Sequence, residues 1–399
     1  GYGVQKKASI TGAVSAIQGK ELVSVKTPNV SNMLAGKLPG LRAVQRSGAP
    51  GDDNASVDIR GYGNMLVIVD GVERDYTQGN PNDIESVSIL KDGAAAVYGF
   101  KGANGVLLVT TKQGSNSKTK IDYGFYYGWQ QNTRYPDLLN PYEYAALYNE
   151  AIYNVNPWRG QPAYSNEELA RYKAGAGTDW WAGTVRNSAP QSSHNLSVSG
   201  GTDKVTYFLS AGIMDQEGIL KSKDWNYKRY NVRSNIKVEV AKGFDVELKI
   251  SGRYDKRKRP FEADKLFASA QQAIPTYSQY ANDNPEYWQA TGNSPNVIQT
   301  SYIDHAGYEN RMRRELNSSL AFTWKLPWVE GLIAKAMIAY DYTNKEWKSW
   351  GKEAYNYIYE PNTESYTPIA IRNNPNLESK QENYFPFYPS YASHSKDWC

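Results

Sequence analysis

Hydrophobic and polar side chains alternate at every second position along several stretches of the chain after residue 115. In the segment 120–130, apolar or aromatic residues from Ile121 to Trp129 occupy the odd positions, and polar residues or glycine occupy most even positions. A period of two is that of a β-strand with one apolar face. The pattern predicts a strand here and six further strands, at about 192–200, 204–214, 228–240, 244–255, 314–325 and 332–343.

The connections between these predicted strands alternate in length. Long connections at about 131–191 and 256–313 are separated by turns of a few residues, such as 201–203 and 241–243. Transmembrane β-barrels combine short periplasmic turns with long extracellular loops, and a tilted strand of about ten residues crosses the membrane. A soluble β-sandwich explains the strands but not the alternating connections. The pattern favours barrel strands, the first of which leaves the periplasm.

The fourth and fifth predicted strands each have one apolar and one charged face, which sets their register. A shift of one residue would move every side chain to the opposite face. We expect the apolar set to face lipid: Val232, Ile236, Val238, Phe244, Val246, Leu248 and Ile250. We expect the charged set to face the barrel interior: Arg233, Lys237, Glu239, Glu247 and Lys249.

The first 115 residues lack this alternation and predict a compact α+β domain. Helix starts are indicated at Asn29, at Asn80 and at Asp92, because such residues cap helices. In the first long connection, Asn140 and Ser165 are each followed three positions later by glutamate, which predicts two further capped helices. The strands that we expect in the N-terminal domain lie at 65–69, 87–90 and 106–111.

Composition adds limits rather than a function. The chain has 32 Tyr, 11 Trp and 33 Gly among 399 residues, which suits short strands and turns. The mean hydropathy is −0.66, and no apolar run reaches the roughly 18 residues of a membrane-spanning helix. The net charge of +4 is too small to indicate a nucleic-acid-binding protein. The single cysteine, Cys399, and the scattered His194, His305 and His394 predict no disulfide framework, metal site or catalytic cluster.

Several segments of the first 115 residues form an ordered set of motifs. They are GAVSAIQGKEL (12–22), NVSNMLAGKLPG (29–40), IRGYG (59–63), VIVDGV (67–72), NPNDIESVSILKDGAAAVYG (80–99) and GANGVLLVTTKQG (102–114). Together they resemble the plug domain of the SusC/RagA-like branch of TonB-dependent transporters. The segment NPYEYAALYNEA (140–151) is similar to the first extracellular loop of that family. The resemblance implies a plug over 1–115 and the N-terminal part of a plugged barrel of about 22 strands over 116–399.

This resemblance also implies a function. Members of the family import a nutrient across the outer membrane of a Gram-negative bacterium, without making or breaking a bond and without a cofactor. The usual cargo is an oligosaccharide, or in some members a peptide, and the usual partner is a SusD-like surface lipoprotein. The family motif GYG, here at 1–3, follows segments that contact TonB, so we expect those contacts to lie upstream of this chain. We expect the long loops outside the cell and the plug facing the periplasm.

Candidate functional residues lie in both parts of the chain. Gly99, Gly102 and Gly105 are interpreted as structural turns, because a phosphate-binding loop would follow a strand and open a helix. The basic run 256–259 is expected at the outer rim, either near anionic lipid headgroups or as a solvated charge cluster. Plug residues expected in capping, turn or plug-to-wall ion-pair roles, or in gating, are Arg60, Asp70, Asp83, Glu85, Lys91 and Asp92. Loop aromatics that are candidates for ligand contact, with loop packing as the alternative, are Trp158, Trp180, Trp181 and Trp288.

Three other functions remain open at this point. A siderophore or cobalamin receptor shares the plug and barrel, a soluble carbohydrate-binding β-protein explains the aromatics, and an enzyme is the least favoured. Seven strands cannot close a barrel, so we expect the isolated chain not to transport and its open sheet to aggregate. The tail at 373–399 loses the alternation and contains three prolines, which predicts a loop or a disrupted end.

Overall fold

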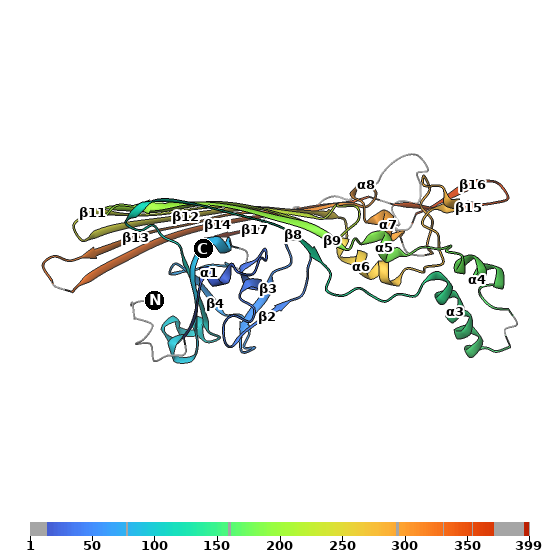
Figure 1. Cartoon of the computed structure of the whole chain (residues 1–399), viewed down its shortest axis with the longest axis horizontal. Coiled ribbons are helices and arrows are strands. Elements are labelled where there is room, and N and C mark those ends of the chain that lie inside the picture. The colour runs from blue at the N-terminus through green and yellow to red at the C-terminus, as the bar shows by residue number, and fades with distance from the viewer. Residues whose placement is uncertain are drawn as a thin grey trace.

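The computed structural model describes residues 14–76, 79–158, 161–292, 295–329, 331–352, 354–370 and 395–398. Within these residues a small N-terminal domain lies against one face of a long, curved antiparallel sheet, which we call the wall (Figure 1). The motif at 1–3, His394 and Cys399 lie outside the described residues. No helix in the described part of the chain is both long and apolar enough to cross a membrane.

The N-terminal domain contains a mixed five-stranded sheet in the order β1-β6-β7-β4-β5 and a separate hairpin, β2-β3. Strands β4 and β7 are parallel, and the other pairs are antiparallel. Leu22, Leu34, Ile84, Val87 and Val109 are fully or almost fully buried in its core. The elements are β1 (Val14–Gln18), α1 (Gly19–Leu22), α2 (Val30–Met33), β2 (Leu41–Gln45), β3 (Ala55–Ile59), β4 (Leu66–Val69), β5 (Val72–Glu73), η2 (Pro81–Asp83), β6 (Ile84–Leu90), η3 (Asp92–Ala94), η4 (Ala96–Gly102) and β7 (Val106–Thr111).

All three predicted helix starts in this domain occur, but their details differ from the expectation. The Asn80 side chain accepts a hydrogen bond from the Asn82 amide at 3.1 Å, as a capping residue does. Asn29 precedes α2 without capping it, because its side-chain oxygen accepts from Arg229 at 3.4 Å and its side-chain nitrogen donates to Asp53. Asp92 lies inside η3 rather than before it, with a positive φ of 52°. Gly99 and Gly105 also have positive φ values, which fits their interpretation as structural turns.

The wall contains the seven predicted strands, and each is longer than predicted. The alternation that marks a strand continues into segments where both faces are polar, which periodic hydrophobicity does not reveal. An eighth strand, β17, pairs with β14 and corrects the prediction of a loop or disrupted end for that part of the tail. The wall strands are β8 (Ser117–Gln131), β9 (Ser188–Gly201), β10 (Val205–Glu217), β11 (Asn226–Ala241), β12 (Phe244–Pro260), β13 (Gly307–Lys325), β14 (Ile333–Gly351) and β17 (Ser395–Trp398).

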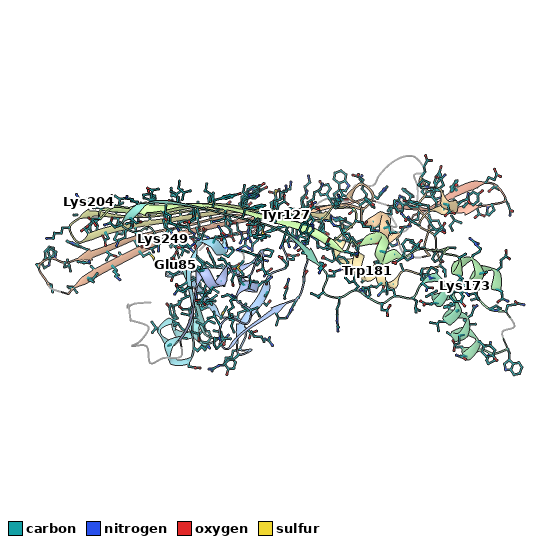
Figure 2. The ribbon with its side chains drawn as sticks, viewed as in Figure 1. Glu85, Tyr127, Lys173, Trp181, Lys204 and Lys249 are labelled. Atoms are coloured by element: carbon teal, nitrogen blue, oxygen red, sulfur yellow. The ribbon has the colours of Figure 1, made fainter. Side chains whose placement is uncertain are left out.

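The predicted register of β11 and β12 is confirmed. Val232, Leu248 and Ile250 are exposed on the face away from the N-terminal domain, Val232 to 58%. Arg233 and Lys249 are buried on the opposite face, and Figure 2 shows Lys249 on the side of the wall that carries the N-terminal domain. The wall therefore has an apolar outer face and a polar inner face.

The two long connections fold into small helices at one end of the wall (Figure 1). The predicted helix start at Asn140 and the predicted capping box of Ser165 with Glu168 are both confirmed, and Asn140 forms a capping box with Glu143 as well. A hairpin of β15 and β16, which was not predicted, lies at the same end. The elements are α3 (Pro141–Val155), α4 (Asn166–Lys173), α5 (Trp180–Thr184), α6 (Ala263–Gln272), η5 (Ala281–Asp283), α7 (Val297–Thr300), α8 (Ile303–Ala306), β15 (Tyr355–Glu360) and β16 (Ser365–Ala370).

Candidate plug interface and ligand cavity

A buried group of charged residues joins the N-terminal domain to the inner face of the wall. Arg233 lies 3.4 Å from Asp83 and 3.9 Å from Asp70, and Lys249 lies 3.7 Å from Asp70. Asp83 also accepts a 2.6 Å hydrogen bond from the Ser210 hydroxyl of β10. Burial raises the pKa of the Asp83 carboxyl, and the nearby Arg233 charge acts in the opposite direction. The two acids of the domain thus face two bases of the wall.

Asp70 and Asp83 are held in place by their own domain. The Asp70 carboxylate accepts hydrogen bonds from the Thr111 amide at 3.0 Å and the Thr111 hydroxyl at 2.7 Å. Asp83 follows the Asn80 cap at the end of η2, and the Asn80 amide group donates to Asn195 of β9 at 2.7 Å. The turn chemistry that forms these elements therefore also aims their polar side chains at the wall.

A second buried group lies around Asp53. Its carboxylate accepts hydrogen bonds from Asn29 at 2.7 Å and from Gln216 of β10 at 3.0 Å. Arg229 of β11 donates to the Pro28 carbonyl at 2.7 Å. Burial is the largest cause of a raised pKa at the Asp53 carboxyl, and its hydrogen bonds act against it. This group fixes the segment around Pro28 to the wall.

Further polar contacts reach the other wall strands. Arg74 donates three hydrogen bonds to Asp341 of β14, at 2.7, 2.8 and 3.1 Å, and a fourth to the Ser318 carbonyl of β13 at 2.8 Å. Arg257 of β12 is ion-paired with Asp52. Polar contacts therefore reach from β9 to β14, with the apolar Phe208 and Met214 of β10 buried among them.

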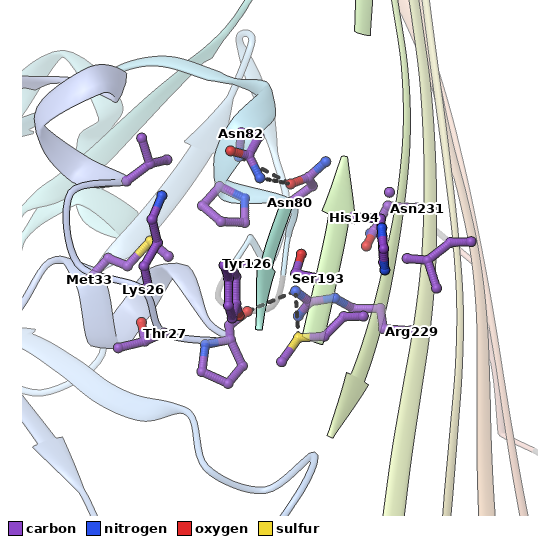
Figure 3. Close-up of a pocket in the computed structure, with 16 residues that line it drawn as sticks. Lys26, Thr27, Met33, Asn80, Asn82, Tyr126, Ser193, His194, Arg229 and Asn231 are labelled. Atoms are coloured by element: carbon purple, nitrogen blue, oxygen red, sulfur yellow. Dashed lines mark hydrogen bonds between the residues drawn. The ribbon is translucent and has the colours of Figure 1, made fainter. Parts of the chain in front are cut away.

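A narrow pocket of about 40 Å³ remains between the domain and the wall. Tyr126 and Arg229 lie on the wall side of this pocket, and Lys26 and Met33 lie on the domain side (Figure 3). A polar gap of this size has room for at least one water molecule, because a water needs about 10–15 Å³. The interface is consequently not packed as tightly as a hydrophobic core.

A much larger cavity, of about 750 Å³, opens where the N-terminal domain meets the helices of the long connections. The domain contributes the segment from Gln45 to Pro50, and the wall contributes Gln130, Gln131 and Gln191. Trp181, Trp225 and Phe267 line the cavity from the side of the connections. Its size falls within the range of small-molecule sites, and its lining combines aromatic rings with amide groups.

Two polar atoms of this cavity lack a hydrogen-bond partner among the described residues. They are Oε1 of Gln191, which accepts, and the indole Nε1 of Trp225, which donates. Leaving a buried polar atom unpaired costs about 1–3 kcal/mol. Both atoms are buried beneath the cavity surface, so a ligand hydroxyl reaches either of them only after neighbouring side chains move. Within the same described residues no group of three His, Cys, Asp or Glu side chains could hold a metal ion.

The other plug residues singled out by sequence lie away from the wall contacts. Arg60 pairs with Asp92 at 3.2 Å on the exposed surface of the N-terminal domain. Glu85 is exposed on β6 (Figure 2). Lys91 is buried and donates to the Pro39 carbonyl, so it holds a turn. The structure thus brings Asp70 and Asp83 together at the interface and leaves these four residues outside it.

The four loop tryptophans have different surroundings. Trp180 is 2% exposed and donates from its indole nitrogen to the Ile274 carbonyl at 2.9 Å. Trp181 and Trp288 are partly buried against the same hydrophobic cluster, and the ring of Trp288 lies at 50° to that of Tyr280 with 4.9 Å between ring centroids. Trp158 is 90% exposed. Packing accounts for Trp180, whereas ligand contact by the other three stays a prediction.

The basic run 256–259 is not a single solvated cluster, which corrects the expectation. It continues strand β12, so its side chains alternate between two faces. Arg257 and Arg259 point inward and are buried, and Arg259 lies 2.7 Å from both Asp264 and Glu309. Lys256 and Lys258 point outward and are exposed.

Several interface residues were missed by sequence reasoning. Two of the missed pairs, Arg74 with Asp341 and Asp53 with Gln216, join residues more than 150 positions apart in the sequence. The bond between Asn29 and Asp53 is shorter in sequence. The available signal was the row of polar side chains on the inner face of the wall strands. That row indicates a polar partner but does not name it.

Comparisons with known proteins agree with this geometry. The family model described as the TonB-dependent receptor plug domain matches residues 6–106. TonB-dependent receptor SusC of Bacteroides thetaiotaomicron is 30% identical over 315 residues, covering 72% of this chain and 29% of that protein. TonB-dependent receptor P3 of Formosa agariphila is 30% identical over 259 residues, covering 63% of this chain and 24% of that protein.

A solved structure shares the fold. The RagAB peptide importer in its open-open state superposes with a TM-score of 0.72 at 23% identity, covering 88% of this chain and 43% of that one. The chain spans less than a third of the length of the two curated relatives. The plug match, the similarity to SusC and the shared fold identify the chain as a SusC/RagA-like TonB-dependent outer-membrane receptor, with a plug domain followed by the antiparallel strands of an unclosed β-barrel.

Proposed function

We propose that the protein of which this chain forms part imports an oligosaccharide across the outer membrane, driven by TonB. Residues 1–115 act as the plug, and residues 116–399 form the first part of the barrel. The long connections face the outside of the cell, the plug faces the periplasm, and a SusD-like lipoprotein covers the outer opening. No bond is made or broken during import.

The polar character of the plug interface is the observation that carries this proposal. Contacts between domains that are polar rather than hydrophobic leave the domains able to move relative to each other. The described contacts from the plug to the wall include Asp83 with Ser210, Asn80 with Asn195 and Arg74 with Asp341. Water can replace each of these bonds when the plug moves, which lowers the free-energy cost of displacing it.

The lining of the large cavity supports an oligosaccharide. Sugars present apolar ring faces and many hydroxyl groups, which match aromatic rings and amide groups. Among the described lining residues, Gln191 holds a buried acceptor and Trp225 a buried donor without a partner, and both become available to a ligand once neighbouring side chains move. A peptide is the second candidate, because Arg46 and Asp264 also line the cavity and could bind its charged groups.

The test uses the full-length receptor together with its lipoprotein partner. Binding of oligosaccharides, peptides and ferric siderophores is measured by isothermal titration calorimetry for wild type and for Gln191→Leu. We expect the substitution to weaken oligosaccharide binding by about tenfold, the cost of roughly one hydrogen bond. Gln113→Leu, at an exposed position outside the cavity, is the matched control.

Each outcome assigns a substrate class. If peptides bind and their binding depends on Gln191, the substrate is a peptide and not an oligosaccharide. If ferric siderophores bind, the protein is an iron receptor. If wild type, Gln191→Leu and Gln113→Leu bind the ligand equally, the large cavity is not the binding site. Uptake that persists in cells without TonB would overturn active import itself.

A further inference from the structure

The outer face of the wall carries two rows of aromatic residues. On β12, Phe244 stacks with Phe322 of β13 at 6.4 Å between centroids, and Tyr254 stacks with Tyr230 of β11 at 6.1 Å. Phe244 and Tyr254 are ten positions apart on the same face. Tilted strands of this length span about 25 Å, the height of the apolar band of a membrane barrel. The two rows therefore mark the two boundaries of the membrane.

Uncharged residues fill the outer face between the two rows. On β12 these are Val246, Leu248, Ile250 and Gly252. Aromatic residues with polar tips prefer the interface between hydrocarbon and water. The Tyr230 and Tyr254 row consequently lies at the level where the lipid headgroups begin.

Four lysines lie just beyond this tyrosine row, and we call them the outer lysine cluster: Lys228, Lys256, Lys258 and Lys348. Lys228 and Lys256 are directly opposite each other in the pairing of β11 with β12. Lys258 is the next outward position of β12, and its β13 partner Asn310 pairs with Lys348 of β14. The cluster therefore draws its lysines from β11, β12 and β14, at two successive outward positions of the sheet.

The cluster has more positive than negative charge. Lys228 is paired with Asp215 at 2.8 Å, and the nearby carboxylates of Glu217 and Glu346 are paired with Arg186 and Arg314. Across the described ranges of the chain, no carboxylate forms an ion pair with Lys256, Lys258 or Lys348, and Asp224 lies near enough to Lys258 for the two charges to interact. Asp215 compensates the charge of Lys228, which leaves Lys256, Lys258 and Lys348 as the lysines without an ion-pair partner among the described residues. An anion beside these three lysines would be attracted by their combined charge.

We propose that the outer lysine cluster binds the phosphate groups of an outer-leaflet lipid of the lipid A class. The lysine stems can lie along the apolar band while their ammonium groups reach the headgroup phosphates. Arg257 and Arg259 of the same sequence run point into the protein and take no part. The site is thus separate from both the plug interface and the ligand cavity.

The experiment titrates the full-length receptor, in neutral detergent, with bisphosphorylated lipid A, with dephosphorylated lipid A and with inorganic phosphate. The variant K256Q/K258Q removes two charges from the cluster. The control K204Q/K242Q makes the same change in the turns at the opposite end of the strands, where Lys204 is seen in Figure 2. Attraction of lysine to an anionic surface corresponds to about fivefold in affinity for each residue, so we expect about a 30-fold loss in the double variant.

The expected pattern is specific. Wild type and the control bind bisphosphorylated lipid A alike, K256R/K258R retains binding, and dephosphorylated lipid A binds weakly to all of them. Equal affinity of K256Q/K258Q and the control would overturn the proposal, and so would equal binding of lipid A with and without phosphate. Saturation by inorganic phosphate at similar concentrations would show a free-phosphate site instead of a lipid site. If K256Q/K258Q does not give a folded barrel, the single variant K258Q and its arginine counterpart are compared in the same way.

Discussion

The guanidinium Nε of Arg233, on strand β11, lies 3.4 Å from the carboxylate of Asp83, on the plug. Both side chains are almost completely buried. A buried charge is tolerated only while its partner is present, because removing one partner leaves the other without compensation. The pair therefore makes the position of the plug sensitive to single substitutions.

Replacing Arg233 by methionine is expected to weaken docking of the plug by about 3–5 kcal/mol, because Asp83 then remains buried without its cation. Pulse proteolysis of the full-length receptor in increasing urea measures the free energy of plug release. The double variant Arg233→Met with Asp83→Asn should recover part of the loss, since it removes the uncompensated charge. Lys237→Met, an exposed position on the same strand, is the control and should change the free energy by less than about 0.5 kcal/mol.

The pH dependence of docking is expected to involve Asp53. Burial raises the pKa of its carboxyl, so the docked plug retains the proton to a higher pH than the undocked plug does. Asp53 consequently contributes most to the free energy of plug docking below its ordinary pKa near 3.8. This contribution declines as the pH rises through the raised pKa of the docked state. The variant Asp53→Asn should lack this decline. The free energy of plug release is measured for wild type and Asp53→Asn between about pH 4 and about pH 7. If the two proteins show the same pH dependence, the assignment to Asp53 is wrong.

Gly114 is expected to be intolerant of a side chain. A Cβ atom at this position would lie 2.2 Å from the backbone nitrogen of Tyr207, where the chain passes from the plug to the wall. Gly114→Ala should therefore destabilise the folded receptor by about 1–3 kcal/mol through overpacking. Gly124→Ala on β8 meets no atom within 4 Å and serves as the control. The folded fraction on heat-modifiability gels distinguishes the two variants, and equal fractions would refute the close approach.

Trp180 and Trp158 are expected to behave in opposite ways. Trp180→Ala removes a buried ring from the cluster that joins α5 to α6 and α7, so it should cost about 3–5 kcal/mol. Trp158→Ala alters an exposed ring and should leave thermal unfolding unchanged while weakening ligand binding. Calorimetric unfolding and ligand titration of both variants separate packing from recognition. Unchanged ligand binding in Trp158→Ala would remove Trp158 from the candidate contacts.

Much of the wall could be predicted from sequence because the signal is local. The register of Val232 and Arg233 follows from two neighbouring residues, since adjacent side chains of a strand point to opposite faces. The same rule would have divided the run 256–259 between two faces. The predicted strand ended at 255 because the outward side chains of β12 change there from apolar residues to lysines, beyond the row of Tyr230 and Tyr254.

The interface partners could not be predicted in the same way. Asp70 and Asp83 were identified as candidates for ion pairs with the wall, but neither Arg233 nor Lys249 is distinguishable by sequence from other inward charges such as Lys237. Pairing depends on how the plug is placed inside the curved sheet, which is a property of the whole fold. The burial of Trp180 depends on α6 and α7, which follow it by more than 80 residues.

The plug is attached to the wall at many separate points along its own sequence, from Pro28 and Asp53 through Asp70 and Arg74 to Asp83. Mechanically, this arrangement distinguishes two ways of opening. A plug withdrawn as a rigid body must rupture all its attachments together, and the required force rises with their number. A plug that unravels under tension from one end loads them one after another, so the force is limited by the strongest single attachment. Single-molecule pulling would record one high rupture peak in the first case and a series of lower peaks in the second.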